Sequence, residues 1–529
     1  MGRVANYLNQ LIVGNVFDAP EVLEAYSTDR SVMQIKPKIV ALPESTDDVQ
    51  KVLKFFYQLS TKDVKLPITV RGTGLDQMGA DLSSGLILST EKLNHLLEMD
   101  KRERLVRVQA GITLRELNTA LSVNGLVVPI GGHDNNTIGG LISACPTDAC
   151  AGKYGGILNY VERIEVVLSN GEILQTNRLN KHQIKAKAKT KGLANEIYQK
   201  IDKLVDANLA LVDELRQKNL GSAGYPTIAQ AKRKNTLDLM PLFFGAEGTL
   251  GVITEVILRA VPIKKPAQRI VATFEDFAMA KKFLDFVAKD LKPRELDIYD
   301  LNIIKTAEGS GKRLREITKK FENGWVVFAA FDDKPNSCFK KINSIRKVLP
   351  RSTQIITEAK GTKIILDEFE NSLANFLNNI RNGERVPLTT DFSLPSDNLA
   401  SFLNDIKVLE EKFDMNLWLY GSYSGSNYNL RPKFNLTNPT FNRKATTYLK
   451  AAAFIIERQG GSLTGGSPEG RVKAIVTNNS LSEKERFLYT EIKKAFDHNG
   501  LLNPDIKLGT DPQYTVRHFR STSSAKIMI

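Results

Sequence analysis

The sequence predicts an α+β fold that is divided into more than one domain. The chain has 529 residues, which is more than one hydrophobic core ordinarily serves. Short β-branched segments alternate with amphipathic helical segments, and their mixed order differs from a regular β-α-β repeat. A segment with two prolines and two lysines, residues 260–268, is typical of a linker. We therefore expect two main units that meet near this linker.

The first part of the chain predicts a series of short elements. Residues 1–36 predict polar helices, and "IVAL" predicts a strand followed by a helix that Ser45 or Thr46 can cap. "LPITVRGTGLDQMG" predicts a strand that runs into a glycine loop, and "TLRELNTALSVNG" predicts an amphipathic helix that Gly125 closes. "RIEVVLSNGEIL" predicts a hairpin with Asn-Gly at its turn.

After the linker, predicted strands and helices alternate. "RIVATFED" and "GWVVFAAFDD" predict strands, whereas "FAMAKKFLDFVAKDL" and "KKINSIRKVL" predict helices. Their spacing is compatible with antiparallel pairing. We therefore expect a compact sheet with helices on one face.

The composition fits a globular protein of the cytoplasm. Hydrophobic residues make up 42% of the chain and charged residues 25%. We find no signal-peptide pattern at the N-terminus and no run that approaches the ~18 apolar residues of a membrane-spanning helix. Cys145, Cys150 and Cys338 are too few and too scattered for a disulfide framework or a metal cluster. A reducing, cytoplasmic location is therefore expected.

The net charge of +14 favours anionic partners. Basic residues gather in two segments, 180–192 and 230–235. These segments indicate either solvated faces of a surface insertion or a patch that contacts anionic lipid headgroups, and the second interpretation places the protein peripherally at the inner face of a membrane. No recognisable nucleic-acid-binding motif accompanies the charge, so we expect no nucleic-acid partner.

Three glycine-rich stretches, 71–79, 128–143 and 243–255, accompany predicted strands. The first is not a dinucleotide fingerprint, because its glycines stand at 72, 74 and 79, and it is not a P-loop, because Ala80 takes the place of the lysine. Its backbone N–H groups can bind an anion, although a plain hairpin turn is the alternative. The second stretch can open a helix whose amides point at a phosphate. Together the three stretches suit one long ligand with a pyrophosphate in its middle.

Six ordered segments carry a family resemblance. "PITVRGTG", "VQAGITLRELN", "TIGGLIS", "KYGG", "VERIEVVLSNGEIL" and "FFGAEGTLGVITE" resemble the FAD-binding domain shared by the vanillyl-alcohol oxidase and para-cresol methylhydroxylase (PCMH) flavoproteins. The resemblance spans about residues 37–262 and recurs in "LLNPDIKLG". It is strongest to the branch that oxidises D-lactate, glycolate and D-2-hydroxyglutarate, with which residues 391–399, 421–432 and 460–473 also align.

The resemblance implies a domain order. It places an N-terminal helical extension at 1–36, a PCMH-type FAD-binding domain of two subdomains at 37–264, an α/β cap domain with a mostly antiparallel sheet at 265–484, and a C-terminal segment that returns to the FAD domain at 485–529. The cofactor that it implies is FAD, with the pyrophosphate on 71–77 and 137–143. The cofactor-binding residues that it implies are Arg71, Gly72, Thr73, Gly74, Leu75, Asp76, Gln77, Pro129, Gly131, Gly132, Thr137, Ile138, Gly139, Gly140, Ser143, Tyr154, Gly155, Glu247, Gly248, Gly251, Val252, Ile253 and Asn503.

Two features near the expected flavin stay open. His133 can attach the flavin covalently, donate a proton or make a loop hydrogen bond. Cys145 and Asp148 stand where the family usually has Asn and Gly, so the local contacts of that segment are expected to differ.

The resemblance also exposes a departure from the hydroxy-acid branch. In that branch, histidines stand at the positions of Ser422 and Asn429, and a Glu-His pair stands at the positions of Gly466 and Ser467. Those side chains hold a divalent cation against the substrate, and the last histidine takes the hydroxyl proton. Serine, asparagine and glycine bind a metal much more weakly than imidazole and carboxylate. We therefore expect no metal at residues 421–473.

Without a metal, other side chains must serve the substrate. Tyr423, Tyr428 and Asp391 are the candidates for proton transfer, although tyrosines in such a segment also serve as packing residues. Arg431 is the candidate clamp for an anionic substrate, unless a nearby acid pairs with it. Glu469 is a weaker candidate that can equally be a solvated loop residue.

The sequence thus predicts an FAD-dependent dehydrogenase or oxidase that acts on a hydroxylated, anionic small molecule without a divalent metal. Its electron acceptor is a quinone, an electron-transfer protein or oxygen. The alternative is a degenerate FAD-binding scaffold or interaction protein.

Overall fold

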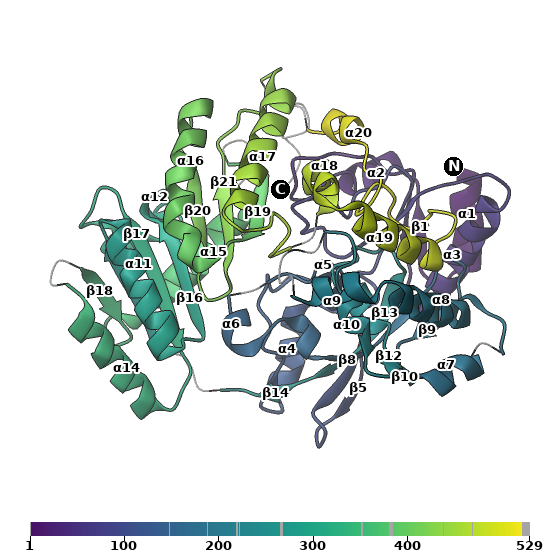
Figure 1. Ribbon diagram of the computed structural model, residues 1–529, viewed down its shortest axis with the longest axis horizontal. Helices are drawn as coiled ribbons and strands as arrows, with labels where there is room; N and C mark the ends of the chain where they lie inside the picture. The colour runs from purple at the N-terminus through teal and green to yellow at the C-terminus, as the bar shows by residue number, and fades with distance from the viewer. Residues whose placement is uncertain are drawn as a thin grey trace.

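The computed structural model describes residues 2–520 apart from 148, 188, 218–220, 222, 265–267, 351–352, 380–384, 437 and 468. Figure 1 shows two bodies side by side. One holds the N-terminal half together with the C-terminal helices, and the other holds a large sheet from the middle of the chain. In the part of the chain that is described, no helix is long and apolar enough to cross a bilayer.

A four-stranded sheet in the first body has the order β1 (Asn15–Phe17), β2 (Ile39–Leu42), β4 (Leu86–Ser89), β3 (Ile68–Arg71). β2, β4 and β3 are parallel, and β1 joins them antiparallel. α1 (Gly2–Leu11) and α3 (Thr46–Ser60) pack on this sheet through one apolar core. Residues 1–36 are therefore more than the expected helical extension, because β1 pairs edge to edge with the first strand of the domain.

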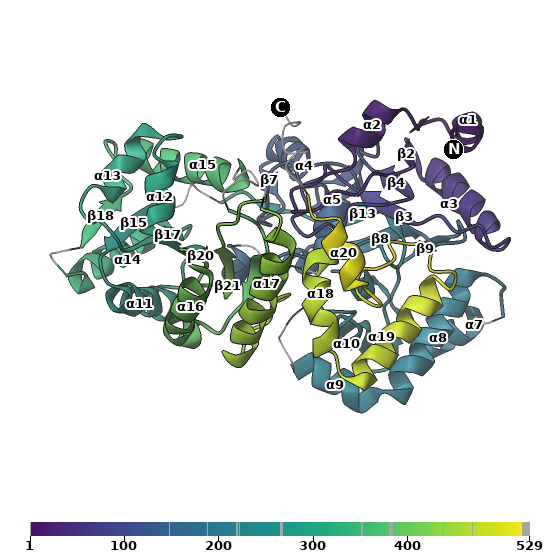
Figure 2. The ribbon, with the colours of Figure 1, turned by 90° about the horizontal axis from the view of Figure 1, so that it is seen from above.

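A five-stranded antiparallel sheet forms the other half of this body, in the order β5 (Leu96–Asp100), β6 (Leu105–Gln109), β13 (Val252–Arg259), β8 (Val161–Val167), β9 (Ile173–Gln175). Its core includes residues of α4 (Leu114–Ser122), α5 (Ile138–Ala144), α8 (Leu193–Ala207), α9 (Leu209–Gln217) and α19 (Glu483–Phe496). α19 thus brings a C-terminal segment back onto the first body. Figure 2 shows α19 beside α8.

The second body is built on a seven-stranded sheet in which every pairing is antiparallel. Its order is β18 (Gln354–Thr357), β15 (Gln268–Phe274), β17 (Trp325–Phe331), β16 (Glu295–Asp300), β20 (Trp418–Ser422), β21 (Asn427–Arg431), β19 (Thr389–Ser393). This mixture of helices with mainly antiparallel sheets confirms the predicted α+β fold class.

The expectation that helices cover one face of this sheet is wrong. α11 (Phe277–Phe286), α14 (Pro335–Val348), α16 (Leu399–Phe413) and α17 (Phe441–Arg458) pack on one face, and α12 (Leu301–Ala307), α13 (Arg315–Thr318) and α15 (Lys363–Asn379) pack on the other. Figure 2 shows the two layers of helices on opposite sides of the strands. β15 explains the arrangement, because Ile270 and Ala272 join one core while Val271 joins the other.

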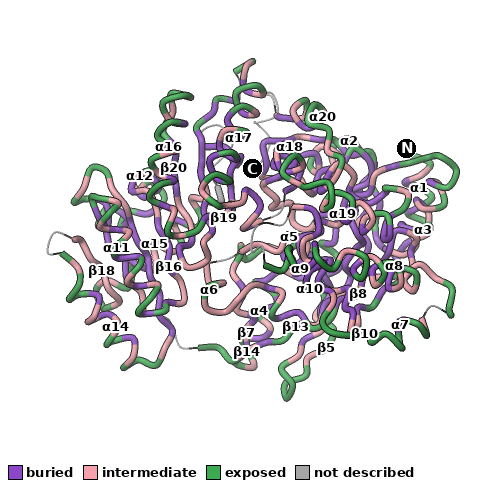
Figure 3. The backbone as a smooth tube through the Cα atoms, in the orientation of Figure 1, coloured by how far each residue is buried: buried purple, intermediate pink, exposed green. Residues whose placement is uncertain are grey.

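The remaining elements are short or connect the two bodies. They are α2 (Pro20–Ala25), α6 (Ala151–Tyr154), α7 (Lys181–Lys187), α10 (Ile228–Ala231), α18 (Gly470–Ser480), α20 (Pro512–Arg517), β7 (Leu126–Val127), β10 (Leu179–Asn180), β11 (Lys232–Arg233), β12 (Thr236–Leu237), β14 (Val261–Pro262), 3₁₀ turns at Ile157–Asn159, Met240–Phe243, Lys312–Leu314 and Ser396–Asn398, and a π turn at Val287–Leu291. Figure 3 shows buried chain running through the strands of both bodies and exposed chain on the outer helices. The site described next lies where the ends of β19, β20 and β21 meet the glycine loops.

Candidate functional site

One cavity of about 570 Å³ lies between the two bodies. One wall is made of glycine loops, residues 72–77, 131–140 and 247–251. The facing wall carries the polar residues Thr390, Asp391, Tyr420, Asn429, Arg431 and Ser467. This volume is within the ~300–1,000 Å³ of ordinary ligand sites.

The first loop follows β3 and depends on its glycines. Gly74 has a φ of 71°, and a Cβ atom there would lie 2.2 Å from Nη2 of Arg71. A Cβ atom at Gly72 would lie 2.6 Å from Oγ1 of Thr137, which belongs to the second loop. The first loop therefore meets the second at Gly72, and a larger residue at Gly72 or Gly74 would require rearrangement.

The second loop leads into α5. Thr137 caps this helix, because its Oγ1 accepts a hydrogen bond of 3.1 Å from the N–H of Gly140. Gly139 donates its N–H to the carbonyl of Ala110 across 2.7 Å. His133 lines the cavity, and its Nδ1 accepts a hydrogen bond of 3.1 Å from the N–H of Asn135. Of the three roles left open for His133, the structure therefore contains the loop hydrogen bond.

The third loop is fastened by two buried polar residues. The side-chain amide of Asn503 donates to the carbonyl of Glu247 across 2.7 Å and to that of Ala80 across 2.9 Å, so Asn503 ties the third loop to the first. The carboxylate of Glu247 accepts from the N–H of Gly470 across 2.8 Å and lies 3.1 Å from Nζ of Lys507. Asn503 thus supports the loops from behind.

Most of the expected cofactor-binding residues line the cavity. Those that line it are Gly72, Thr73, Gly74, Leu75, Asp76, Gln77, Gly131, Gly132, Thr137, Gly139, Gly140, Ser143, Glu247, Gly248, Gly251 and Ile253. Those that lie outside its lining are Arg71, Pro129, Ile138, Tyr154, Gly155, Val252 and Asn503. Asp148, where we expected altered contacts, lies outside the described residues.

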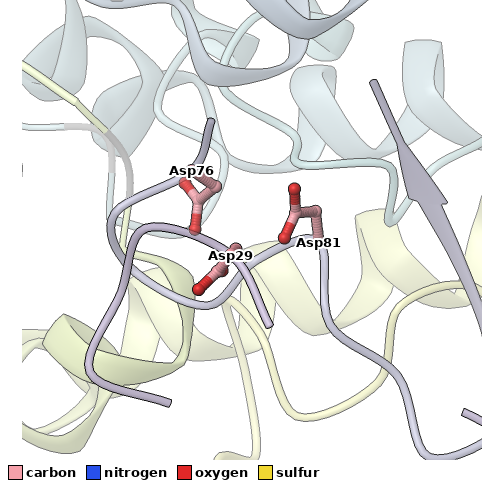
Figure 4. Close-up of side chains that lie close together, drawn as sticks. All are labelled: Asp29, Asp76 and Asp81. Atoms are coloured by element: carbon pink, nitrogen blue, oxygen red, sulfur yellow. The ribbon is translucent and has the colours of Figure 1, made fainter. Parts of the chain in front are cut away.

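An acidic cluster lies beneath the first loop. The carboxylates of Asp29, Asp76 and Asp81 approach one another within 4.8 Å, and Figure 4 shows Asp76 and Asp81 on one loop with Asp29 between them. Burial, and after it the charge of Asp81, raises the pKa of Asp76 to about 7 and that of Asp29 well above its usual range. Arg71 lies 3.7 Å from Asp81 and Arg520 lies 3.8 Å from Asp29. Two arginine side chains of the protein therefore provide positive charge next to these carboxylates.

Successive side chains of β21 point to opposite faces of the sheet, and this alternation decides which of them reach the facing wall of the cavity. Asn429 and Arg431 face the cavity, whereas Tyr428 belongs to the apolar core on the opposite face of the sheet. Tyr428 is fully buried, and Tyr423 is buried in the same core with its hydroxyl bonded to Asp285. This corrects the expectation that Tyr423 and Tyr428 serve the chemistry, because neither reaches the cavity.

Arg431 is buried, with only 4% of its surface exposed, and it borders the cavity. Its Nη2 donates to Oε1 of Gln77 across 2.9 Å, and its Nε and Nη2 lie 3.3 and 3.2 Å from the hydroxyl of Tyr420. Within the described residues, no carboxylate lies within 4.0 Å of its guanidinium. Among the described residues, Arg431 is therefore not paired with an acid. A buried guanidinium held by neutral partners can bind an anion from the cavity.

Asp391 lines the cavity in a strained conformation. Its φ is 51°, at an irregularity in the pairing of β19 with β21. Its Oδ1 accepts long hydrogen bonds from the amides of Asn427 (3.4 Å) and Asn429 (3.5 Å). Its carbonyl accepts from the N–H of Gly466 across 2.9 Å. Asp391 is thus a cavity carboxylate that also orders the wall around it.

The four positions at which the resemblance implies metal ligands in the hydroxy-acid branch are in different surroundings. Asn429 and Ser467 line the cavity. Ser422 is buried and accepts from the N–H of Gly425. A Cβ atom at Gly466 would lie 2.1 Å from Oδ1 of Asn427, so Asn427 occupies the space that a larger side chain would need.

Two buried ionisable residues belong to α18: Glu469 stands directly before the helix and Lys473 lies within it. Glu469 is fully buried, accepts from the hydroxyl of Thr477 across 3.1 Å, and lies 3.7 Å from Nζ of Lys507, so neither interpretation made from the sequence, candidate acid or solvated loop, describes it. Lys473 is fully buried, and its Nζ donates to Oγ of Ser467 across 3.0 Å. The sequence analysis missed Lys473, because lysine is almost always exposed. It also missed Ala374 and Leu377 of α15, which line the cavity.

The basic segment at 230–235 is partly neutralised. Nζ of Lys232 lies 2.7 Å from Oδ1 of Asp202, and Asp206 also pairs with it. Contact with an anionic membrane through the basic segments stays a prediction.

The chain is similar to known flavoprotein families and to individual proteins. A family model described as "FAD binding domain" matches residues 37–177, and one described as "FAD linked oxidases, C-terminal domain" matches residues 263–506. The chain is 25% identical to D-2-hydroxyglutarate dehydrogenase of Pseudomonas putida, over 90% of this chain and 49% of that protein, so it spans about half the length of that relative. It is 24% identical to the glycolate oxidase subunit GlcD of Bacillus subtilis, over 93% of each chain.

The fold is similar to that of solved structures. p-Cresol methylhydroxylase with bound substrate superposes with a TM-score of 0.66 at 14% identity, covering 96% of each chain. 4-Ethylphenol oxidase from Gulosibacter chungangensis superposes with a TM-score of 0.67 at 14% identity, again over 96% of each chain. At this identity the likeness concerns the fold alone.

Proposed function

We propose that this chain, which models of an FAD binding domain and of an FAD-linked oxidase C-terminal domain match over residues 37–177 and 263–506, is a member of the FAD-linked oxidases. We propose further that it is an FAD-dependent oxidoreductase that acts on a hydroxylated, anionic small molecule without a divalent metal. FAD is the cofactor of this family. The electron acceptor that we propose is a quinone, an electron-transfer protein or oxygen.

The glycine wall of the cavity fits FAD. The loops at 72–77 and 137–140 meet where Gly72 lies against Thr137, a position that leaves no room for a Cβ atom. Both loops line the cavity, so their backbone N–H groups are available to an anion there. We propose that these two loops hold the pyrophosphate and that 131–132 and 247–253 border the flavin. When bound, FAD supplies an acceptor for the hydride that leaves an alcohol carbon.

The proposal of an anionic substrate rests on the surroundings of Arg431. Burying a charge without a partner is costly, and Arg431 has only the neutral Gln77 and Tyr420 beside it among the described residues. A carboxylate or phosphate in the cavity would complete its hydrogen bonding with the bidentate geometry that a guanidinium prefers. Because Gln77 belongs to the first glycine loop, this anion would bind next to the cofactor.

The residues around Arg431 do not fit a divalent cation. Asp391 supplies a carboxylate, but Oδ1 of Asn429 already accepts from the N–H of Asp391 across 3.2 Å. Asn427 fills the space beside Gly466. The one group of three acidic, histidine or cysteine ligands among the described residues is the aspartate cluster beneath the first loop, which two arginines border. The proposed reaction therefore uses no metal ion.

The test is the visible spectrum of the purified, FAD-loaded protein under anaerobic conditions. We expect D- or L-2-hydroxy acids to bleach the flavin and the corresponding 1,2-diols, which lack the carboxylate, to bleach it far more slowly. Treatment with EDTA should leave the rate unchanged, and reoxidation by quinone, electron-transfer protein or oxygen identifies the acceptor. Bleaching that requires added metal contradicts the proposal, and a flavin untouched by the whole panel favours the scaffold alternative.

A further inference from the structure

A partly buried hydrogen bond connects the cavity to Lys473, a residue of α18. Ser467 lines the cavity beside Asp391 and Asn429. Behind it, Nζ of Lys473 is 3.0 Å from Oγ of Ser467, and Lys473 has no exposed surface. A proton that leaves the cavity by this route passes first through the serine hydroxyl and then reaches the amine.

We propose that Ser467 and Lys473 form a proton relay, in which Oγ of Ser467 receives the hydroxyl proton of the substrate and passes its own proton to Nζ of Lys473. This inference rests on the proposed function. Oxidation of an alcohol needs a group that accepts the hydroxyl proton, and Ser467 is a cavity hydroxyl with an amine behind it.

The surroundings of Lys473 allow it to be a neutral amine. Of the described carboxylates, none lies within 4.0 Å of Nζ. Asp391, Glu247, Asp76 and Glu469 face it at longer range and favour the ammonium, but burial outweighs them and lowers the pKa of Lys473 to about 8. A neutral amine has a lone pair that can accept the Ser467 proton, and an ammonium has none.

The other ionisable groups of the cavity are less suited to this role. The guanidinium of Arg431 donates hydrogen bonds and offers no acceptor atom. Asp391 is held by two amide hydrogen bonds to its Oδ1. His133 lies on the glycine wall, where its Nδ1 is occupied by the N–H of Asn135. Lys473 is the amine that a single hydroxyl links to the cavity.

The step balances as follows. The substrate loses a hydride from carbon to FAD and a proton from oxygen to Ser467, so its C–O bond becomes a carbonyl. The electron pair of the C–H bond would go to the FAD that the glycine loops would hold, and Ser467 recovers its hydroxyl as its original proton moves to Lys473. Lys473 finishes the step as an ammonium, which returns the proton through the same hydroxyl before the next turnover.

The first test compares variants in the rate of flavin reduction between pH 6 and pH 10. Wild type should speed up as pH rises through about 8, because only the neutral amine accepts a proton. Ser467→Ala and Lys473→Met should be slower by ~10²–10⁴-fold and should lose this rise. Lys473→Arg keeps a donor to Ser467 but cannot take a proton, so it should be as slow as Lys473→Met.

A control and a second measurement separate chemistry from folding. Thr477→Val alters the same helix one turn away, and it should keep the pH profile of wild type. The free energy of unfolding of the full chain gives a readout without substrate. Between about pH 8 and pH 10 the unfolded state binds more protons at Lys473 than the folded state, so wild type should gain stability relative to Lys473→Met as pH rises.

Each outcome decides the proposal. A Lys473→Arg protein with the wild-type rate and pH profile overturns it, as does a profile that Asp391→Asn flattens while Lys473→Met leaves it intact. If no hydroxy acid reduces the flavin of wild type, the proposed function fails by itself. In that case, equal pH dependence of unfolding in wild type and Lys473→Met overturns the relay.

Discussion

Nη2 of Arg431 donates to Oε1 of Gln77 across 2.9 Å, and this bond joins the edge region of the seven-stranded sheet to the first glycine loop. Arg431 ends β21, whereas Gln77 follows β3, far apart in the sequence. The contact therefore places the guanidinium of Arg431, which comes from the seven-stranded body, beside the first glycine loop. A bound anion would lie between the two bodies, and both bodies would contribute to its position.

Replacing Arg431 should weaken the use of anionic substrates. Arg431→Lys keeps a charge but loses the planar fork, and Arg431→Gln loses both. Because a hydrogen bond to a charged group contributes about 1.5–3 kcal/mol, we expect kcat/KM for a 2-hydroxy acid to fall by about 10- to 150-fold in Arg431→Gln. Steady-state kinetics with the acid and its diol analogue measure this effect.

Arg458→Gln is the matched control for this substitution, because Arg458 is a half-exposed arginine that pairs with Asp405 on the outer helices. It should leave kcat/KM unchanged. If Arg431→Gln changed the rates with acid and diol equally, Arg431 would not bind the anion of the substrate.

Gly74→Ala should weaken FAD binding. The φ of 71° disfavours any L-residue, and the new Cβ atom would collide with the guanidinium of Arg71. A strain of ~1–2 kcal/mol in the bound loop corresponds to a loss of affinity of about tenfold. Gly156→Ala is the control, because its Cβ atom would meet nothing within 4 Å and its φ is −84°. Fluorescence titration of the apo-protein with FAD compares them, and equal affinities would show that the loop tolerates the change.

Local sequence features predicted the glycine wall well, because a glycine loop after a strand is a local requirement of the backbone. The facing wall was harder, since a strand pattern does not say which of its two faces meets the cavity. The tyrosines at 423 and 428 were therefore chosen wrongly, while Arg431 and Asp391 do line the cavity. Lys473 was missed because its burial depends on where α18 packs, which no short stretch of sequence encodes.

The helices on both faces of the large sheet could have been anticipated. Within β15, Ile270, Val271 and Ala272 are successive apolar residues, and a continuous apolar run is typical of a strand that is buried on both sides. The order of strand-like and helix-like segments predicts which elements form. The number of sheet faces that helices cover is indicated instead by the apolar pattern within each strand.

Glu469 should make the protein less stable as pH rises from about 4.5 to about 7. Burial, opposed by the charge of Lys507, raises the pKa of Glu469 to about 7. The folded state thus holds a proton that the unfolded state releases near pH 4.5, and this stabilisation is lost as pH passes the folded pKa. Urea unfolding across this range should show a smaller decline in Glu469→Gln, by on the order of 3 kcal/mol. Glu491→Gln, at an exposed carboxylate of α19, should behave as wild type.

Asn427 should limit what can be placed at position 466. A Cβ atom at Gly466 would lie 2.1 Å from Oδ1 and 2.4 Å from Cγ of Asn427, and Asn427 is itself fixed by a 2.8 Å hydrogen bond to the carbonyl of Thr147. Gly466→Ala should therefore lower the free energy of unfolding by about 1–3 kcal/mol, as overpacking does. In the double variant with Asn427→Ala the clash is gone, so the two substitutions should be less destabilising together than the sum of their separate effects. Urea unfolding of the four proteins measures this coupling, and strict additivity would show that Asn427 does not restrict the size of the side chain at position 466.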